Sequence, residues 1–310
     1  MSGLADAVAD YLVVRRALGY KLARAEKLLG QFVAHCEQVG ATTVRTDVAV
    51  AWAQLPAEGS AWWWSQRLGV VRAFAVWQQA RDRDCEVPPA GVFGPARSGR
   101  AVPYLYTDAE VVALMDATYR LRYPLERATY RALVGLLAVS GLRIGEAIAL
   151  DRADVDFDEA QLTVWRSKFG KSRVVTLHTT TVNALSAYAS VRDELCPHPK
   201  APSFFVSSAG TRLVYCNVSS LFHKLVRLAG LVPRGERCRP RLHDFRHRFA
   251  VLTLLDWHRG GRDVEARLPL LSTFMGHADP KHTYWYLSAT PELLALAADR
   301  LDRHEQERRS

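Results

Sequence analysis

The stretch QLTVWRSKFGKSRVVTLH, residues 161–178, interrupts a chain whose pattern is otherwise helical. On both sides of a glycine-containing centre, β-branched residues alternate with polar ones, which is typical of two strands joined by a turn. The sequence therefore predicts an antiparallel β-hairpin here. Because helical periodicity surrounds it, we expect a mainly α protein with a small antiparallel sheet, an α+β fold.

The chain on either side of the hairpin divides into domains. Four segments of helical spacing between Leu4 and Ala80 predict a helical domain over residues 1–82. Residues 83–102 are rich in proline and glycine and have no apolar periodicity, as expected of a linker. A second domain over residues 103–297 begins near Thr107, whose spacing to Glu110 fits a capping box, and a tail follows over residues 298–310. Further helices are predicted at about 127–139, 142–150, 179–194, 216–229, 243–257, 263–275, 280–288 and 291–307.

The charge and the cysteines narrow the class of protein. Lysine and arginine total 41 against 32 acidic residues, a net charge of +9, which favours polyanionic partners without establishing one. The five cysteines are scattered, odd in number and without a Cys-x-x-Cys pair, as in reduced cytosolic proteins. No apolar run approaches the roughly 20 residues of a membrane helix. We therefore expect a cytoplasmic protein with no membrane partner.

The stretch RLHDFRHRFAVLTLL, residues 241–255, predicts a helix with polar chemistry on one side. At about 100° per residue, its apolar positions form one stripe: Phe245, Phe249 and Leu252. His243, Arg246 and His247 gather opposite that stripe, as a solvated basic face or as part of a site. The His-Asp-x-x-His spacing is also close to a zinc motif. However, Arg246 would lie beside the metal and no third ligand stands out, so we expect no metal.

The segment SGLRIGEAIAL, residues 140–150, predicts a second polar pair. Gly141 suits the end of one helix, and Arg143 lies in the first turn of the next. Arg143 and Glu146 are three residues apart and can pair, which by itself is typical of an ordinary surface ion pair.

The hairpin centre contains GKS, which is shared with phosphate-binding loops. That motif needs a glycine five residues before Gly170, where this chain has Trp165, so no nucleotide cofactor is predicted. What remains is a tip that bears Lys168 and Lys171. Such lysines are either solubilising charge or ammonium groups that a flexible tip delivers to a reacting group.

The stretch GHADPKHTYWYLSAT, residues 276–290, places two tyrosines behind a Gly-His pair. Gly276 suits a helix C-terminus and Asp279 an N-cap, so a short new helix is expected to carry the tyrosines. Tyr284 and Tyr286 then lie about 200° apart around it, and only one can face a given pocket. Aromatic residues at this spacing are more often packing.

Taken in order, GLRIGEAIAL, SKFGKSRVV, HDFRH and MGH, with a tyrosine nine residues after the last histidine, resemble the signature of the tyrosine recombinase, or phage integrase, family. The resemblance covers about residues 103–297, and the helical front is similar to the family's core-binding domain. The residues that take the family's catalytic positions are Arg143, Lys168, His243, Arg246, His277 and Tyr286. Glu146 takes a supporting acidic position, and Tyr284 falls on the packing side.

The resemblance implies DNA strand cleavage and rejoining through a 3′-phosphotyrosyl intermediate, without metal, ATP or other cofactor. It implies as partners double-stranded DNA with inverted-repeat core sites, and a homo-tetramer on DNA or an assembly with sibling recombinases. Lys168 or Lys171 would be the general acid. The apolar face of the tail would dock on its own domain or on a neighbouring protomer. Basic residues expected to contact DNA are Arg15, Arg16, Lys21, Arg24, Lys27, Arg67, Lys171 and Arg173. The alternatives are an accessory DNA-binding protein without catalysis and a type IB topoisomerase.

Overall fold

The computed structural model describes residues 3–94, 102–165, 172–277, 279, 281–288 and 295 of the chain. These residues fall into two compact units, one within residues 1–100 and the other within residues 101–310. Each unit has its own hydrophobic core. No helix among the described residues is both long enough and apolar enough to cross a membrane.

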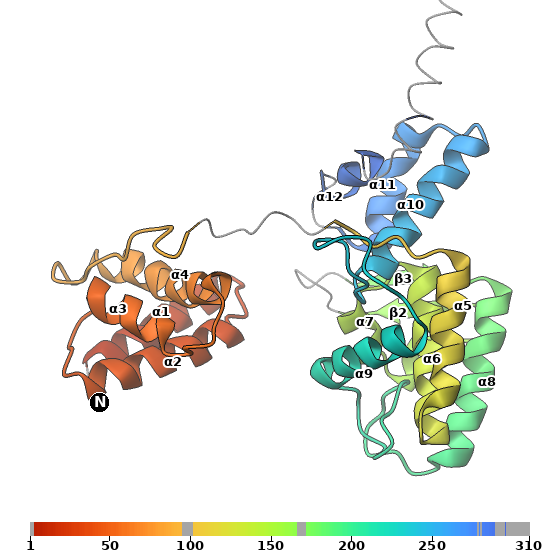
Figure 1. Ribbon diagram of the computed structural model, residues 1–310, viewed down its shortest axis with the longest axis horizontal. Helices are drawn as coiled ribbons and strands as arrows, with labels where there is room; N and C mark the ends of the chain where they lie inside the picture. The colour runs from red at the N-terminus through yellow and green to blue at the C-terminus, as the bar shows by residue number, and fades with distance from the viewer. Residues whose placement is uncertain are drawn as a thin grey trace, which may run out of the picture. The chain divides into compact units, whose positions relative to one another are not determined.

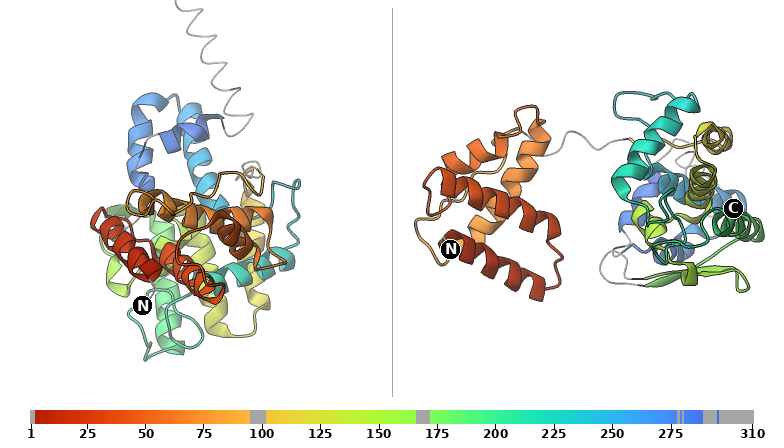
Figure 2. Two further views of the ribbon diagram at one scale, coloured as in Figure 1. Left: turned by 90° about the vertical axis from the view of Figure 1, so that its left-hand side faces the viewer. Right: turned by 90° about the horizontal axis from the view of Figure 1, so that it is seen from below.

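The first unit contains the four predicted helices, which pack side by side (Figures 1 and 2). Aromatic rings fill its centre, with Phe32 edge-on to Trp52 at 5.3 Å and Tyr11 edge-on to Phe74 at 5.6 Å. Burying such rings removes a large apolar area from water and holds short helices together. The helices are α1 (Gly3–Ala17), α2 (Ala23–Gln38), α3 (Thr46–Gln54) and α4 (Ala61–Gln78).

The beginning of the predicted linker packs on this first unit. Cys85 is buried, and the backbone N–H of Glu86 donates to the carbonyl of Val44 at 2.8 Å. The Glu86 carboxylate also accepts from the N–H of Thr46, the first residue of α3. Residues 85 and 86 are therefore held by the four-helix core.

The second unit is mainly helical with one small sheet (Figure 1). Its helices before the sheet are α5 (Asp108–Ala117), the 3₁₀ turn η1 (Thr118–Arg120), α6 (Pro124–Ser140), α7 (Ile144–Ala149) and the 3₁₀ turn η2 (Arg152–Asp154). Its helices after the sheet are α8 (Thr179–Leu195), α9 (Tyr215–Leu228), α10 (Asp244–Arg259), α11 (Val264–Met275), α12 (Lys281–Tyr284) and the 3₁₀ turn η4 (Trp285–Ser288). The capping box predicted from Thr107 and Glu110 at the start of α5 is confirmed.

The sheet has three antiparallel strands in the order β1 (Val155–Asp156), β2 (Gln161–Val164) and β3 (Arg173–Thr176). The predicted hairpin is confirmed, because Leu162 pairs with Val175 and Val164 with Arg173. Leu162 and Val175 point into the core on one face of the sheet, as the alternation required. Strand β1 was not predicted, because two residues are too short to show a period. The α+β fold class is confirmed.

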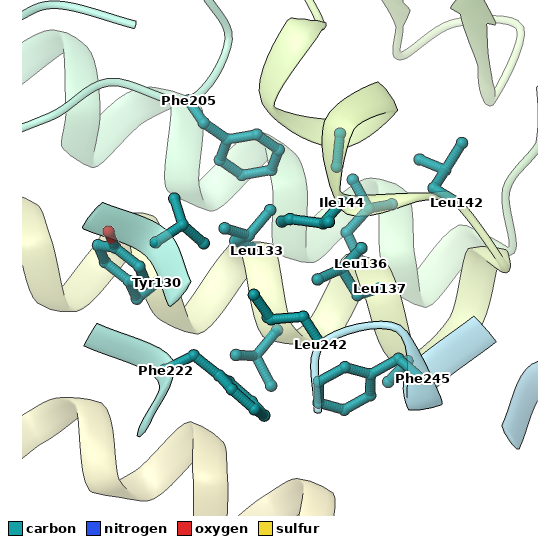
Figure 3. Packing of buried hydrophobic residues seen from close by; sticks show 14 of the residues in the cluster. Tyr130, Leu133, Leu136, Leu137, Leu142, Ile144, Phe205, Phe222, Leu242 and Phe245 are labelled. Carbon is teal, nitrogen blue, oxygen red and sulfur yellow. The ribbon is translucent and has the colours of Figure 1, made fainter. Parts of the chain in front are cut away.

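Helix α6 is the centre of the second unit. Its leucines Leu133, Leu136 and Leu137 are buried, each removing apolar surface worth about 2 kcal/mol. Figure 3 shows Ile144 and Phe245 packed around this helix. Because Ile144 begins α7 and Phe245 lies in the first turn of α10, the core fixes the starts of both helices.

Helices α10 and α11 and the turn η4 enclose a separate apolar cluster that includes Leu254, Leu271 and Met275. Helix α10 touches α6, α11 and η4. The predicted apolar stripe therefore describes only part of the buried surface of α10. Phe245 is buried, but Leu252 is exposed, and the side opposite the stripe is also covered.

Candidate active site

The segment between α6 and α7 begins the site. Helix α6 ends at Gly141, whose φ of +61° favours glycine, and a Cβ atom there would lie 2.5 Å from the Phe249 ring. Arg143 then caps α7. Its N–H donates to Glu146 Oε2 at 3.0 Å and its Nη1 to Glu146 Oε1 at 2.8 Å. The predicted pairing of Arg143 with Glu146 is confirmed.

Arg246 comes from the first turn of α10 and is only 1% exposed. Its Nη1 donates to the carbonyl of Gly141 at 2.6 Å and its Nη2 to the carbonyl of Met275 at 2.6 Å. Burial and the nearby charge of Arg143 lower the Arg246 pKa to about 10, so the guanidinium is charged at neutral pH. The alternative that Arg246 lies on a solvated basic face is excluded, because its guanidinium is enclosed by the ends of α6 and α11.

The C-terminal end of α11 holds three arginines at once. Gly276, with φ of +66°, and His277 close the helix by donating to Thr273 and Ser272, as in a Schellman motif. This closure leaves successive carbonyls without helical partners, and their partial negative charge attracts cations. The carbonyls of Phe274, Met275 and Gly276 accept from different arginines: Arg173 at 2.8 Å, Arg246 at 2.6 Å and Arg143 at 3.0 Å, respectively.

Glu146 joins two of these arginines. Besides Arg143, it accepts from Arg173 through Nη1 at 3.1 Å and Nη2 at 2.7 Å. Burial raises the Glu146 pKa, but hydrogen bonds and charge from Arg173 and Arg143 outweigh burial and bring the pKa down to about 2. Arg173 was predicted as a DNA contact. Its side chain is 9% exposed and bound to Glu146 and Phe274, which disfavours that prediction.

His243 lies immediately before α10, at the solvent-exposed edge of the site. Although part of the residue stays exposed, the protein packed around the ring removes water from it, and this desolvation contributes most to lowering the pKa. The charges of Arg246, Arg143 and Arg241 also contribute, and together these effects bring the pKa to about 4. The imidazole is therefore neutral at pH 7 and can accept a proton. Its ring lies edge-on to that of His247, with centroids 4.9 Å apart.

Tyr286 lies in η4 with two histidine rings beside it. The centroid of its ring is 5.5 Å from that of His247 and 6.2 Å from that of His277, to which it is nearly parallel. Tyr286 is 3% exposed, whereas Tyr284 is 53% exposed. The two tyrosines thus face opposite ways as predicted, but the placement of Tyr284 on the packing side was wrong. The inner side of the turn carries Tyr286, because that side faces α10.

His277 is held by the turn that precedes Tyr286. Its Nδ1 lies 2.7 Å from the hydroxyl of Thr283, which is buried. The Asp279 carboxylate accepts from the N–H of Lys281 at 2.9 Å, close to the capping role predicted for it. A hydrogen bond at one ring nitrogen fixes the orientation of an imidazole.

The arrangement suits an anionic substrate that is attacked by a tyrosine. Two charged guanidiniums, a neutral imidazole and a tyrosine are contributed by segments far apart in the sequence. Among the residues that the structure describes, no group of three or more His, Cys, Asp or Glu side chains could hold a metal ion.

The sequence model of the phage integrase family matches residues 105–292, which contain every residue of this site. The chain belongs to the phage integrase family. Its members are tyrosine recombinases, and the chain is accordingly an enzyme of site-specific DNA recombination that breaks and rejoins strands through a tyrosine.

Curated relatives agree with the family. A Sinorhizobium fredii protein described as an integrase/recombinase, y4rB, is 41% identical over 99% of this chain and 100% of its own. The tyrosine recombinase XerD of Mycobacterium leprae is 31% identical over 64% of this chain and 61% of its own. Among solved structures, the Tn1549 transposon integrase in complex with circular intermediate DNA has a TM-score of 0.63 at 19% identity. That alignment covers 97% of this chain and 100% of the other, a likeness of fold.

Two predicted lysines of this recombinase, Lys168 and Lys171, lie outside the described residues, as does the whole tail over residues 298–310. Their roles stay predictions. The choice between the two lysines as general acid stays open for the same reason.

The basic residues of the first unit differ in exposure. Lys21, Arg24 and Lys27 are exposed, and Arg24 lies over the Trp63 ring at 4.9 Å. Arg16 is also exposed but pairs with Glu26 at 2.6 Å. Arg15 is half-buried and covers the Tyr20 ring at 4.0 Å.

Arg67 does not fit the predicted DNA contact. It is 6% exposed, its guanidinium covers the Trp52 ring at 3.9 Å, and its Nη2 donates to the carbonyl of Trp52 at 2.9 Å. The positive charge is buried against an aromatic ring and a carbonyl of the same unit. This position disfavours the predicted DNA contact and stabilises the packing of α4 on α3.

Three residues of the site were missed. His247 was placed on the same face as His243 and Arg246 and in a possible zinc motif, but it was given no role of its own in the site. Thr283 is three residues before Tyr286, and nothing in the sequence marks it. Arg173 was seen only as a charge, since its partners Glu146 and Phe274 lie far from it in the sequence.

Proposed function

We propose that Tyr286 is the nucleophile that attacks a DNA phosphodiester. The observation that carries this proposal is the position of Tyr286: it is buried, with the rings of His247 and His277 beside it. Arg246 is close enough for its charge to favour a phenolate at Tyr286. A free tyrosine has a pKa of about 10, so a cationic surrounding is what its ionisation requires.

Arg143 and Arg246 hold the nonbridging oxygens of the phosphate. Negative charge grows on these oxygens during attack, and guanidiniums stabilise it through paired, charge-assisted hydrogen bonds. Both guanidiniums are already fixed by carbonyls of Gly141, Met275 and Gly276. They supply the positive charge that a metal provides elsewhere, so we infer a reaction without a metal.

Proton transfer completes the step. The Tyr286 oxygen forms a bond to phosphorus while the bond to the 5′ oxygen breaks, and His243 takes the phenolic proton. Lys168, or Lys171 in its place, gives a proton to the leaving 5′ oxygen. His277 orients a phosphate oxygen or the nucleophile. The 3′-phosphotyrosyl ester keeps the energy of the broken bond. A 5′ hydroxyl can therefore reverse the step without ATP.

The two units divide the task. The first, over residues 1–82, is the core-binding domain, and the second, over residues 103–297, is the catalytic domain. The recombinase acts in the cytoplasm on inverted-repeat core sites as a tetramer, or together with sibling recombinases. Exposed Lys21, Arg24 and Lys27 of the first unit contact phosphates. The tail over residues 298–310 docks within the same protomer or on its neighbour.

The proposal is tested by covalent trapping. Wild-type protein first selects its site from a pool of duplex DNA with a randomised centre. The selected duplex is then nicked close to the cleavage point, so that the short 5′-hydroxyl strand leaves and the protein stays attached. Wild type and Tyr284→Phe should give a protein–DNA band on a denaturing gel, and Tyr286→Phe should give none.

Three other outcomes would contradict the proposal. A band with Tyr286→Phe would reject the assignment of the nucleophile. Tight binding by wild type without any band would favour an accessory DNA-binding protein. Relaxation of supercoils by a monomer without site preference would favour a type IB topoisomerase.

A further inference from the structure

Arg173 is a site residue that the proposed chemistry does not use. It is the first residue of β3, and its side chain is almost completely enclosed. The donors Nε, Nη1 and Nη2 are all engaged, with Phe274 O, Glu146 Oε1 and Glu146 Oε2. A guanidinium has five N–H donors in a fixed plane, so these three bonds set its orientation. Arg173 is not placed to bind a phosphate.

The bonds of Arg173 close a ring around the site. Glu146 lies between Arg173 and Arg143, and both arginines reach the end of α11 at Phe274 and Gly276, respectively. The ring therefore ties the sheet, the start of α7 and the end of α11 together. The chain that leaves α11 continues through His277 to Tyr286. Each member of the ring therefore helps to set the position of Arg143 and of the turn that carries Tyr286.

The backbone of Gly276 independently indicates that the Arg173 guanidinium belongs beside the end of α11. A Cβ atom at position 276 would lie 2.7 Å from Nη1 and 3.0 Å from Cζ of Arg173, and the backbone has φ of +66°. The glycine therefore serves two purposes: it closes α11 in a left-handed conformation, and it lets the guanidinium pass against the backbone. A smaller or misplaced side chain at position 173 would leave the space beside Gly276 empty.

The charge of Arg173 also keeps its partner ionised. Among the groups that lower the Glu146 pKa, Arg173 contributes the most, ahead of Arg143. Without Arg173, Glu146 would keep a single arginine partner in a buried place. A buried carboxylate with one partner is less strongly ionised and less firmly oriented, so Arg143 would lose its fixed support.

We propose that Arg173 is a positioning residue for DNA cleavage, which fixes Glu146 and the end of α11 so that Arg143 and Tyr286 meet the same phosphate. This inference rests on the proposed function of Arg143 and Tyr286. It predicts an effect on the rate of cleavage at saturating DNA. A DNA contact would instead affect the affinity.

The test compares Arg173→Met, Arg173→Lys and Arg192→Met with wild type on the nicked duplex selected by wild type. Arg192 is a matched control, since it is buried in α8 and binds the carbonyls of Ser203 and Phe204 and the carboxylate of Asp193, away from the site. DNA affinity and the rate of covalent complex formation at saturating DNA are measured below the unfolding temperature of all four proteins. Thermal unfolding of each protein is measured separately.

Arg173→Met should slow covalent complex formation about 10- to 100-fold, because a misplacement of reacting groups by about 1 Å can cost about 100-fold in rate. DNA affinity should change less than about 3-fold. Arg173→Lys should recover part of the rate, because an ammonium reaches Glu146 but cannot also span to Phe274. Arg192→Met should unfold at a lower temperature yet cleave within about 2-fold of wild type.

A wild-type rate in Arg173→Met, or a loss of affinity alone, would overturn the positioning role. Equal slowing in Arg192→Met would also overturn it, because general destabilisation would then explain the effect. Failure of wild type itself to form the covalent complex would count against the proposed function, and so against the inference that rests on it.

Discussion

Arg246 donates to the carbonyl of Met275 at 2.6 Å, and this bond joins the first turn of α10 to the last turn of α11. The second branch of the same guanidinium binds the carbonyl of Gly141 at the end of α6. One buried side chain thus holds three helix ends at the place where the phosphate is proposed to bind. Catalysis and the local fold depend on the same bonds.

Replacement of Arg246 by lysine tests this double dependence. A lysine cannot bond both carbonyls and a phosphate oxygen, because it lacks the planar fork. Arg246→Lys is expected to slow covalent complex formation at saturating DNA by about 10²- to 10³-fold, the usual effect of losing a donor to a developing anion. Gel quantification over time measures this rate. A rate within a few-fold of wild type would show that Arg246 is only structural.

The pH dependence of cleavage should report His243. Its pKa is about 4 because of desolvation and of Arg246, Arg143 and Arg241, so the base is neutral at all pH values above that. On the acidic side, kcat/KM should stay level from pH 7 to about 5 and fall with unit slope only near pH 4. Glu146, with a pKa of about 2, adds no step in this range. An acidic limb centred near the ordinary histidine value of about 6.5 would contradict this placement.

Thr283→Val should slow cleavage through His277. The substitution keeps the shape of the side chain but removes the partner that lies 2.7 Å from Nδ1. Loss of one orienting hydrogen bond is expected to cost about 10-fold in the rate at saturating DNA. Thr253→Val is the control, because the Thr253 hydroxyl donates to the carbonyl of Phe249 within α10. If both variants cleave at the same rate, Thr283 does not orient His277.

Replacement of Arg67 and replacement of Lys27, both in the first unit, should affect different properties: folding stability and DNA binding, respectively. Arg67→Met is expected to lower the free energy of unfolding by about 1–3 kcal/mol, since a buried charged hydrogen bond and a ring contact are lost. Lys27→Met should leave unfolding unchanged, weaken binding to all duplexes and reduce the slope of log K against log salt by about 1. Chemical denaturation and salt titrations measure both. A changed salt slope in Arg67→Met with normal stability would restore it as a DNA contact.

The fold could be predicted from local pattern where the pattern repeats. The helices and the hairpin follow from spacings of 3.6 and 2 residues, and Gly141 and Gly276 mark helix ends because both have positive φ. The two residues of β1 are too few to show a period. The order of the motifs, together with the Gly-His to Tyr286 spacing, led to the site.

The burial of charged side chains could not be predicted from the sequence. Arg67, Arg173 and Arg246 look like surface cations in their own segments, yet each is enclosed by partners far along the chain. The tyrosines show the same limit. A helical wheel predicts that Tyr284 and Tyr286 face opposite ways, but only the packing of η4 against α10 decides which one is inside.

The most direct test of the account is to locate the attachment on the protein. Wild type trapped on the nicked duplex is digested with nuclease and protease, and the peptide that carries nucleotides is sequenced by tandem mass spectrometry. The account predicts a nucleotide joined through its 3′ phosphate to Tyr286, with Tyr284 unmodified. A nucleotide on Tyr284 or on any other residue would contradict it.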